Sequence, residues 1–489
     1  MTRNGAADPF TAPGTGFVPS AMDPAAVHPL PPAPTGASAD GYPPGMAHRT
    51  VLTCPQPDLI AVYEAALHNL LDINTIGGII RAGGGYPDPW TRDASINAWY
   101  AASFLSPDAA RDTLLAVTGG TLVQQDDQWW DQIIWAVAAW NHVLVTGDED
   151  FLARAYPIAT ATMEALDKER RDGRYGLYRG GAVMQDGISG YPEPPNDPDI
   201  ESSFVLDYPQ SHSIMCLSTN AVYVGAHRAL ARMAAALGDD ERPHLERADA
   251  TAAAVNQWLW RADAGLYGYF LSEDGRLDPH QEALGLAMAI LFGVADEQRA
   301  ALIAANTHRE PRGVVNVWPH FDRYGPGRPG RHNAICWPMV MGVWGDAMAR
   351  SGHVDRFLET LQDLVGLFGG DGLSEVYNAT TGTPDGGWQQ GRPWPSEPDQ
   401  TWSATTMLGL VHHGLFGIRL EPEGMRFSPA VPTHWSDAAL TGLRYRDMTL
   451  HITVSGGGTA VRSVRLDGRE VDLVSATLTG HHDVRITLT

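Results

Sequence analysis

The stretch "DASINAWYAASFLSPDAARDTLLAVT" at residues 93–118 predicts two helices joined by a tight turn. Apolar residues recur at helical spacing over 93–105 and again over 108–118. Between these segments, Ser106 is placed to cap the second helix, and Pro107 suits its first turn. The helical hairpin is therefore the unit from which we interpret the rest of the chain.

The same helical period continues on both sides of this hairpin. Candidate helices lie near 58–72, 93–105, 108–118, 129–146, 149–168, 213–237, 240–261, 280–293, 295–306, 333–351, 353–369 and 401–414. Connections after the even-numbered helices are short, and those after the odd-numbered ones are mostly longer. Paired helices whose long loops all emerge on one side are what a closed ring of six hairpins requires. We therefore predict an (α/α)6 barrel whose long loops cover a central funnel.

The two ends of the chain differ from this middle part. Residues 1–50 are rich in Pro, Gly and Ala and show no period, which predicts an extended arm. After residue 418, apolar and polar residues alternate and are broken by Gly-rich and Asp-Gly turns, which predicts an antiparallel sheet. The expected domains are thus an arm at 1–50, the mainly α barrel at 51–418 and a small β domain at 419–489.

Composition excludes several classes of partner and cofactor. The net charge of −23 and the pI near 5.1 disfavour nucleic acid and anionic membrane surfaces, which need clustered Lys and Arg. Three cysteines at no metal-ligand spacing suggest neither disulfides nor a zinc site. No leader-like start, no apolar run of membrane length and no nucleotide or metalloprotease motif is found. We expect a cytoplasmic protein without metal or cofactor.

Aromatic and charged residues are concentrated in the long loops and at the helix starts that follow them. Trp90 offers a flat face for a sugar ring, while Arg92 and Asp93 can bind hydroxyls. A salt-bridged helix start is an equally ordinary explanation for Arg92 and Asp93. The full set of predicted substrate-binding residues is Trp90, Arg92, Asp93, Asp127, Trp129, Trp130, Tyr191, His332, Trp337, Tyr377, Trp388, Gln400 and Trp402.

Two carboxyl groups in opposite loops are the catalytic candidates. Asp186 follows the apolar "AVM" in the longest loop and precedes Gly187, so it is the acid of that loop best placed for burial. Glu375 lies in the irregular, tryptophan-rich connection at 372–400. Glycoside hydrolysis needs one carboxyl that donates a proton to the leaving oxygen and a second that activates water or attacks the sugar.

Four motifs resemble those of six-hairpin glycosidases, nearest to glycoside hydrolase family 63 and its trehalase-like relatives: "YPDPWTRDASINAWYAASFLSP", "CWPMVMGVW", "SEVYNATTG" and "QTWSATTML". The resemblance covers roughly residues 58–418. It implies inversion of configuration, with Asp186 in "MQDGISGYP" as general acid and Glu375 in "SEVYNATTG" as general base. It further implies that Trp90, Arg92, Asp93 and Trp337 bind sugar, while Tyr191 replaces the tryptophan usual in the family. The segment "FSPAVPTHW" is similar to the start of the β caps that follow this barrel in rhamnosidases and disaccharide phosphorylases.

The predicted function is that of an inverting, exo-acting glycosidase for a small α-glycoside or short oligosaccharide. A glucosyl or mannosyl group on glycerate is one such substrate, and Arg92, Arg331 or His332 could then bind its carboxylate. The alternatives are a disaccharide phosphorylase, an α-L-rhamnosidase-like enzyme, a sugar 2-epimerase and a non-catalytic sugar-binding protein. The arm at 1–50 could also join subunits into a homo-oligomer.

Overall fold

The computed structural model describes residues 49–124, 128–192 and 202–489. Twelve helical segments are found in these ranges, as the periodicity predicted, when 91–105 and 129–146 are each counted as one segment. A π-helical turn at Ala98–Ala102 joins the two helices of the first, and the single turn residue Ile133 joins those of the second. Further π-helical turns at Asn69–Ile73 and Leu410–Leu415 extend two other segments. The helices are α1 (Pro57–His68), α2 (Thr91–Asn97), α3 (Ser103–Leu105), α4 (Pro107–Ala116), α5 (Trp129–Gln132), α6 (Ile134–Thr146), α7 (Glu149–Arg170), α8 (Leu217–Leu237), α9 (Arg242–Trp258), α10 (Ala283–Leu291), α11 (Glu297–Asn306), α12 (Pro338–Arg350), α13 (Val354–Asp371) and α14 (Thr401–Gly409).

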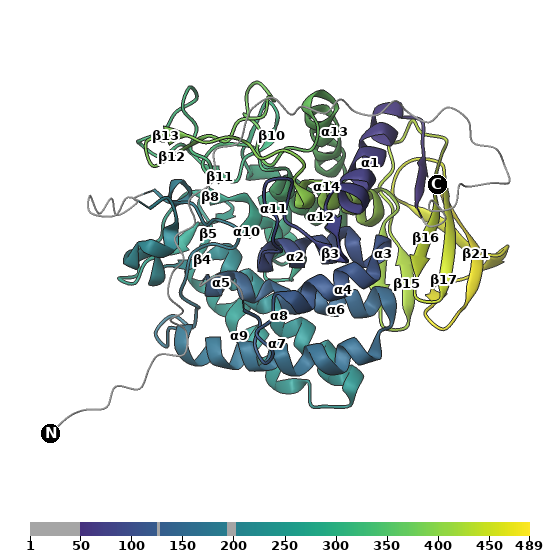
Figure 1. Cartoon of the computed structure of the whole chain (residues 1–489), viewed down its shortest axis with the longest axis horizontal. Helices are drawn as coiled ribbons and strands as arrows, with labels where there is room; N and C mark the ends of the chain where they lie inside the picture. The colour runs from purple at the N-terminus through teal and green to yellow at the C-terminus, as the bar shows by residue number, and fades with distance from the viewer. Residues whose placement is uncertain (1–48, 125–127, 193–201) are drawn as a thin grey trace. The chain divides into compact units, whose positions relative to one another are not determined.

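Six of these helices form a closed inner ring. Each of α2, α6, α8, α10, α12 and α14 packs on the next, and α14 packs on α2 (Figure 1). Every residue of α2 and α14 is buried, as expected for helices enclosed on all sides, whereas outer helices such as α9 expose one face. The (α/α)6 barrel is thus confirmed.

Helix ends explain why the connections alternate in length. Inner helices α6 and α8 stop at Gly147 and Gly238, whose φ angles of 72° and 81° are left-handed, and the chain turns at once into the outer partner. Asp148 then caps α7 by accepting a hydrogen bond from the backbone N–H of Phe151. Pro107 occupies the first turn of α4 as predicted, but the side chain of Ser106 makes no capping bond.

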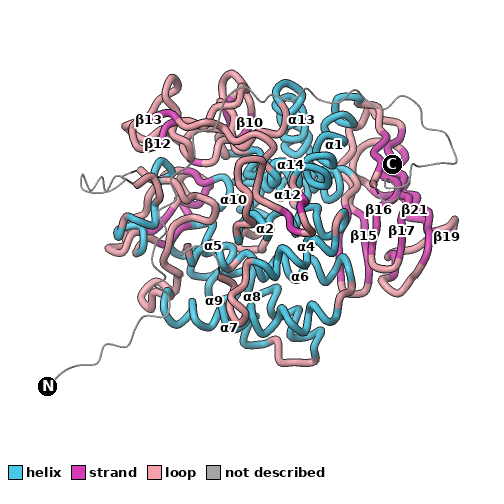
Figure 2. The backbone as a smooth tube through the Cα atoms, viewed as in Figure 1, coloured by secondary structure: helices cyan, strands magenta, loops and turns pink. Residues whose placement is uncertain are grey.

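The long loops all lead into the N-terminal ends of inner helices, so they lie at one end of the barrel. Short strand pairs tie them together, including β8 (Gln281–Glu282) with β11 (Val317–Trp318), β4 (Met215–Cys216) with β7 (Phe270–Leu271) and β12 (Trp388–Gln389) with β13 (Arg392–Pro393). Two-stranded pairs are also formed by β2 (Thr75–Ile76) with β3 (Ile79–Ile80), β5 (Trp260–Arg261) with β6 (Leu266–Tyr267) and β9 (Arg309–Glu310) with β10 (Gly313–Val314). Figure 2 shows these loops mainly at the end away from the C-terminal sheet.

The C-terminal part folds into two sheets. The larger has the order β1–β16–β17–β21–β18–β19, and the smaller has the order β14–β15–β20. Their strands are β1 (Val51–Thr53), β14 (Ile418–Glu421), β15 (Gly424–Phe427), β16 (Asp437–Tyr445), β17 (Met448–Ser455), β18 (Val461–Leu466), β19 (Arg469–Glu470), β20 (Val474–Ser475) and β21 (Gly480–Leu488). Most pairs are antiparallel as predicted, but β17 and β21 run parallel because the chain crosses through β18, β19 and β20 between them. Pairing of β1 with β16 was not predicted.

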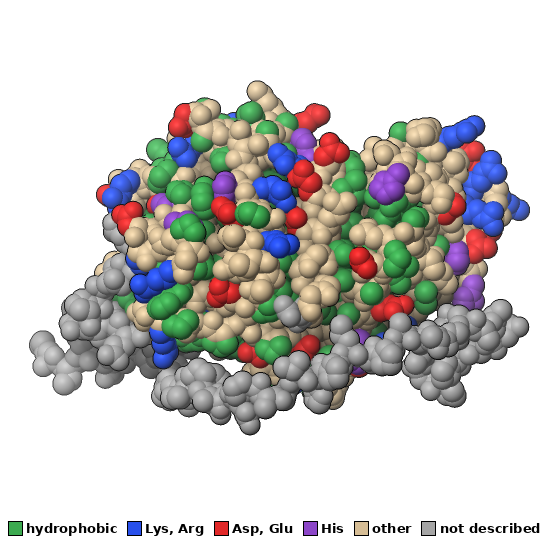
Figure 3. Space-filling model, turned by 90° about the horizontal axis from the view of Figure 1, so that it is seen from above, with side chains coloured by type: hydrophobic (Ala, Val, Ile, Leu, Met, Phe, Trp, Pro, Cys, Tyr) green, Lys and Arg blue, Asp and Glu red, His purple; other side chains and the backbone are tan. Residues whose placement is uncertain are grey.

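Charged side chains cover the free edge of the larger sheet. Arg462, Arg465 and Arg469 on β18 and β19 are exposed, and Figure 3 shows basic side chains gathered at that end. Charge on an edge strand opposes pairing with another chain. Within the described ranges, no helix is long and apolar enough to cross a membrane.

Candidate active site

Arg92, in the first turn of α2, is bound by three carboxylates from three different elements. Its Nη2 lies 2.9 Å from Oδ2 of Asp186, its Nη1 lies 3.2 Å from Oδ2 of Asp131, and its Nε lies 3.6 Å from Oδ2 of Asp93. The guanidinium also lies over the ring of Trp90, 5.1 Å from its centre. The Trp90, Arg92 and Asp93 group predicted from sequence is therefore brought together with the predicted acid.

A second buried ion pair joins Arg331 and Glu375. A short hydrogen bond runs from Nη2 of Arg331 to the Glu375 carboxylate. The other terminal nitrogen of Arg331 donates to the carbonyl oxygens of Gly386 and Pro395, at 3.2 and 3.0 Å. Arg331 thus organises the loop at 372–400 around Glu375. This explains why so long a connection is ordered without helices of its own.

His332 and two tryptophans connect these ion pairs. His332 stacks on Trp337 with a centroid distance of 4.8 Å, and its Nε2 lies 3.4 Å from Oδ1 of Asp186. Trp337 donates from Nε1 to the carbonyl of Arg331 at 2.7 Å and meets the ring of Trp402 edge-on at 6.1 Å. The predicted residues of the loops before α8, α12 and α14 therefore surround one group of charges.

The carboxylates of this group have opposite pKa shifts. Burial alone would raise the pKa of Asp186, but Arg92, His332 and Arg331 outweigh it and hold that pKa well below its usual range. Burial raises the pKa of Asp93 to about 8, helped by the negative charges of Glu375, Asp186 and Asp131 and opposed by Arg92. Burial thus favours the protonated form of Asp93 at neutral pH, whereas the neighbouring cations favour the ionised form of Asp186.

Several buried polar atoms at the start of α14 and in the preceding loops lack a partner. Gln400 donates from Nε2 to Oδ1 of Asp93 at 3.4 Å, but its Oε1 has no hydrogen-bond partner among the described residues. The same holds for Nε1 of Trp402 and Nδ1 of His332. Buried polar groups are normally paired, so these three atoms are suited to bind hydroxyl groups.

Two predicted binding residues bond their hydroxyl groups to the backbone of their own loops. The hydroxyl of Tyr191 accepts from the backbone N–H of Ala182 and donates to the carbonyl of Gln185, both at 2.9 Å, and its side chain is buried. The hydroxyl of Tyr377 accepts from the N–H of Ser374 at 2.9 Å and donates to the carbonyl of Gly372. Each tyrosine closes a turn beside one of the two candidate carboxyls.

The remaining predicted aromatic residues lie in the barrel wall or at its rim. Trp129 donates from Nε1 to the carbonyl of Arg179 at 2.9 Å, and Trp130 is fully buried. Trp388 is half-buried, with the guanidinium of Arg328 4.2 Å from its ring centre. Asp127 lies outside the described residues.

Sequence reasoning missed three residues of this cluster. Asp131 looked like an ordinary acid in the first turn of a helix. Tyr86 has a raised pKa, chiefly because of the charge of Glu375, so it lies near the candidate base. Gln389 accepts from the hydroxyl of Ser189 at 3.0 Å and so joins the loop of Glu375 to the loop of Asp186. The polar "WQQG" after Trp388 was the only signal for Gln389.

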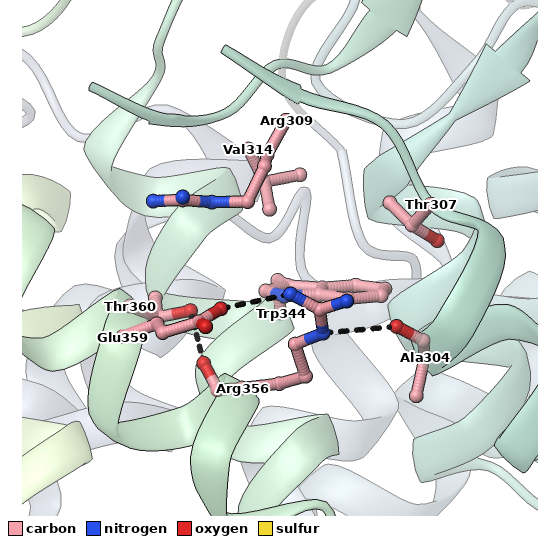
Figure 4. A pocket seen from close by; sticks show the side chains of 8 residues that line it. All are labelled: Ala304, Thr307, Arg309, Val314, Trp344, Arg356, Glu359 and Thr360. Carbon is pink, nitrogen blue, oxygen red and sulfur yellow. Dashed lines mark hydrogen bonds and ion pairs between the residues drawn. The ribbon is translucent and has the colours of Figure 1, made fainter. Parts of the chain in front are cut away.

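Two cavities lie outside this cluster. A cavity of about 10 Å³ between α11, α12 and α13 is lined by Trp344, Arg356 and Glu359 (Figure 4) and has room for one water molecule at most. A larger one, about 730 Å³, lies between the loops at 171–216 and 259–282, and Tyr191 is the one predicted site residue in its lining. In the described part of the chain, no three His, Cys, Asp or Glu side chains are placed to share a metal ion.

A family model matches residues 86–403, and its description is mannosylglycerate hydrolase MGH1-like glycoside hydrolase domain. The matched range contains Asp186 and Glu375. A search of curated proteins finds no significant match.

Solved structures with the same barrel include a sialidase, with a TM-score of 0.68 and 18% identity over 88% of this chain. The chain spans 41% of the length of that sialidase. The GH63 mannosylglycerate hydrolase from Thermus thermophilus, in complex with Tris, matches with a TM-score of 0.57 and 17% identity, over 71% of this chain and 99% of its own. The GH78 rhamnosidase of a Bacillus species matches with a TM-score of 0.61 and 16% identity. The match covers 91% of this chain and 44% of the rhamnosidase. At these identities the likeness shows the fold alone.

Proposed function

Because the chain belongs to the family of mannosylglycerate hydrolase MGH1-like glycoside hydrolase domains, we propose that it is an inverting, exo-acting glycosidase. Its substrate would be a small α-glycoside or short oligosaccharide. The observation that carries this proposal is that Asp186 and Glu375, from two different long loops, join one cluster of charges and each pair with a separate arginine. One carboxyl on each of two loops suits a reaction that needs an acid on one side of the bond and a base on the other.

In this proposal Glu375 is the general base. The ion pair with Arg331 holds its carboxylate in place, and in this role the carboxylate accepts a proton from an attacking water molecule. The side chain is largely buried, so few water molecules can reach it. The position of Tyr86 near Glu375 supplies a hydroxyl that can hold that water or a sugar hydroxyl.

Asp186 is the proposed general acid, and its electrostatics set a condition on this role. A proton donor must hold a proton, whereas Arg92 and His332 keep the pKa of Asp186 low. A bound sugar can change this balance in two ways: it removes water from Asp186, and its hydroxyls compete for Arg92. We therefore expect Asp186 to take up its proton when substrate binds.

The first substrates to test are α-mannosyl and α-glucosyl glycerate, because the family is named for mannosylglycerate hydrolase. Arg92 already contacts three carboxyl groups, and Arg331 pairs with Glu375 and donates to two backbone carbonyls, so both are poor receptors for the carboxylate of a ligand. Arg328 is exposed, stacks on Trp388 and has no ion pair with a described residue. It is better suited to bind the carboxylate of an acidic aglycone at the rim.

The decisive experiment follows the hydrolysis of a panel of α-glycosides by NMR and identifies the first-formed anomer. Release of the β-anomer of the free sugar supports inversion. Release of the α-anomer, or of sugar 1-phosphate in phosphate buffer, would contradict the mechanism proposed here. Glu375→Gln should reduce kcat by about 10²–10⁴-fold. The matched control is Glu273→Gln, an exposed glutamate in another loop.

A further inference from the structure

Asp131, on the short helix α5, holds two parts of the site at once. Its Oδ2 accepts from Nη1 of Arg92 at 3.2 Å, and its Oδ1 accepts from the backbone N–H of Met184 at 3.1 Å. The side chain is about 1% exposed. One carboxylate therefore binds both the cation that pairs with Asp186 and the backbone two residues before Asp186.

The backbone at Met184 adopts a conformation that a methionine does not favour. Its φ is 71°, in the left-handed region where a Cβ is disfavoured. The N–H of Gln185 bonds the carbonyl of Ala182 at 3.0 Å, and the N–H of Asp186 bonds the carbonyl of Met184 at 3.1 Å. This tight turn fixes the backbone position from which the Asp186 side chain extends. The bond from Met184 to Asp131 is one of the contacts that hold the turn.

Asp131 also shares the charge of Arg92 with Asp186. Without Asp131, the guanidinium would be freer to turn and would act more strongly on Asp186, which would also lose a neighbouring negative charge. The other charged or titratable groups that act on Asp186, or on which it acts, are Arg92, Arg331, His332, Asp93 and Tyr86.

We propose that Asp131 is a positioning residue that fixes Asp186 against Arg92 by binding Arg92 and the Met184 turn together. This inference rests on the proposed role of Asp186 as general acid. Asp131 itself does not contact the sugar. It acts by placing the carboxyl that does, so it changes the chemical step more than substrate binding.

Two variants separate the two contacts of Asp131. Asp131→Asn keeps an oxygen for the Met184 N–H but removes the negative charge beside Arg92. Asp131→Ala removes both contacts. We expect Asp131→Ala to lower kcat by about 10²-fold with a much smaller change in KM, because a small displacement of a reacting group is costly. Asp131→Asn should shift the basic limb of the kcat profile to lower pH, by about one unit, because a like charge near the acid is lost.

Replacing Met184 with glycine tests the turn itself. Glycine adopts the left-handed region without strain, so Asp131→Ala/Met184→Gly should recover about tenfold of the kcat lost in Asp131→Ala. The matched control is Asp172→Asn, which alters another buried aspartate that bonds an arginine, Arg179 at 2.6 Å, and a backbone N–H, that of Arg174 at 2.8 Å. An equal loss of kcat in Asp172→Asn would show that any buried aspartate of this loop region matters as much, and would overturn the proposal.

A crystal structure of Asp131→Ala gives a readout that does not depend on activity. We expect Met184 to leave the left-handed region and the Asp186 carboxyl to move relative to Arg92. An unchanged contact and turn would refute the positioning role, whatever the substrate proves to be. If wild-type protein hydrolyses no glycoside, or if Asp186→Asn is fully active, the proposed function fails instead, and this structure still decides the role of Asp131.

Discussion

Asp186 and Arg92 form an ion pair of 2.9 Å in which the arginine is shared with two further, almost fully buried carboxylates. A single guanidinium therefore contacts Asp186, Asp131 and Asp93, and of these Asp93 has a pKa raised to about 8. This shared pairing couples the stability of the barrel mouth to the protonation of the proposed acid, and both can be measured.

Arg92→Met should destabilise the protein strongly at alkaline pH. Removing one partner of a buried ion pair costs about 3–5 kcal/mol, because the remaining charges are left without compensation. At acidic pH the carboxylates can take up protons, so the loss should be smaller. Urea unfolding of wild type and variant at pH 5 and pH 8.5 measures the loss in free energy of unfolding at each pH. Equal losses at the two pH values would show that Arg92 does not hold ionised carboxylates.

Asp93→Asn should flatten the pH dependence of stability. The pKa of Asp93 is raised to about 8 in the folded protein, against about 3.9 in an unfolded chain. Between these values the folded state binds one proton more, so this group favours folding below pH 4 and its contribution is lost as pH rises to 8. The slope is about 1.4 kcal/mol per pH unit. Denaturant titrations of wild type and variant between pH 4.5 and 8 measure the free energy of unfolding at each pH. If this free energy falls equally steeply with pH in both proteins, Asp93 is not protonated in the folded state.

Asp186→Asn and Glu375→Gln should respond differently to the leaving group. An activated leaving group such as dinitrophenolate departs without a proton, so Asp186→Asn should recover most of its activity on such a substrate. Glu375→Gln should not, because activation of water is still missing. Kinetics on dinitrophenyl and alkyl glycosides of the same sugar test this. Recovery in Glu375→Gln alone would exchange the two assignments.

Trp402→Phe should weaken sugar binding and also lower the stability of the fold, because a smaller ring leaves a void at an almost fully buried position. Nε1 of Trp402 has no partner among the described residues, so no bond within the described protein is lost. A sugar hydroxyl bonded to it contributes about 0.5–1.5 kcal/mol. Calorimetric titration with the product sugar should show a Kd raised several-fold, while thermal unfolding stays cooperative with a moderately lower Tm. Unchanged affinity would place Trp402 outside the binding site.

The sequence predicted the barrel because its signals are local. Apolar spacing marked all twelve helices, and Pro107 and the residues around Gly147 lie at real helix boundaries. The parallel pairing of β17 with β21 could not be predicted in this way, because a period of two is the same for a strand in either direction. The strand Val51–Thr53 was missed because three residues carry no period.

For the candidate site, the sequence identified which loops contribute residues but not which contacts each side chain makes. Glu375 and Asp186 lie in loops that the structure brings into one cluster. Asp131 was overlooked, since an acid in a helical first turn needs no special explanation. Tyr191 and Tyr377 were expected to face the sugar, but their hydroxyls bond backbone groups of their own loops. Such bonds depend on how each turn closes, which composition does not record.

The pairing of Val51–Thr53 with β16 has a consequence for how this protein is made. The strand Val51–Thr53 is made long before its partner, because almost the whole barrel lies between them in the sequence. The inner ring of helices closes where α14 packs on α2, and these two helices are also far apart in the sequence. The sheet and the ring therefore close only when segments far apart in the sequence have both been made, which slows folding. Until then the apolar faces of the inner helices lack cover, and such exposed surface favours aggregation.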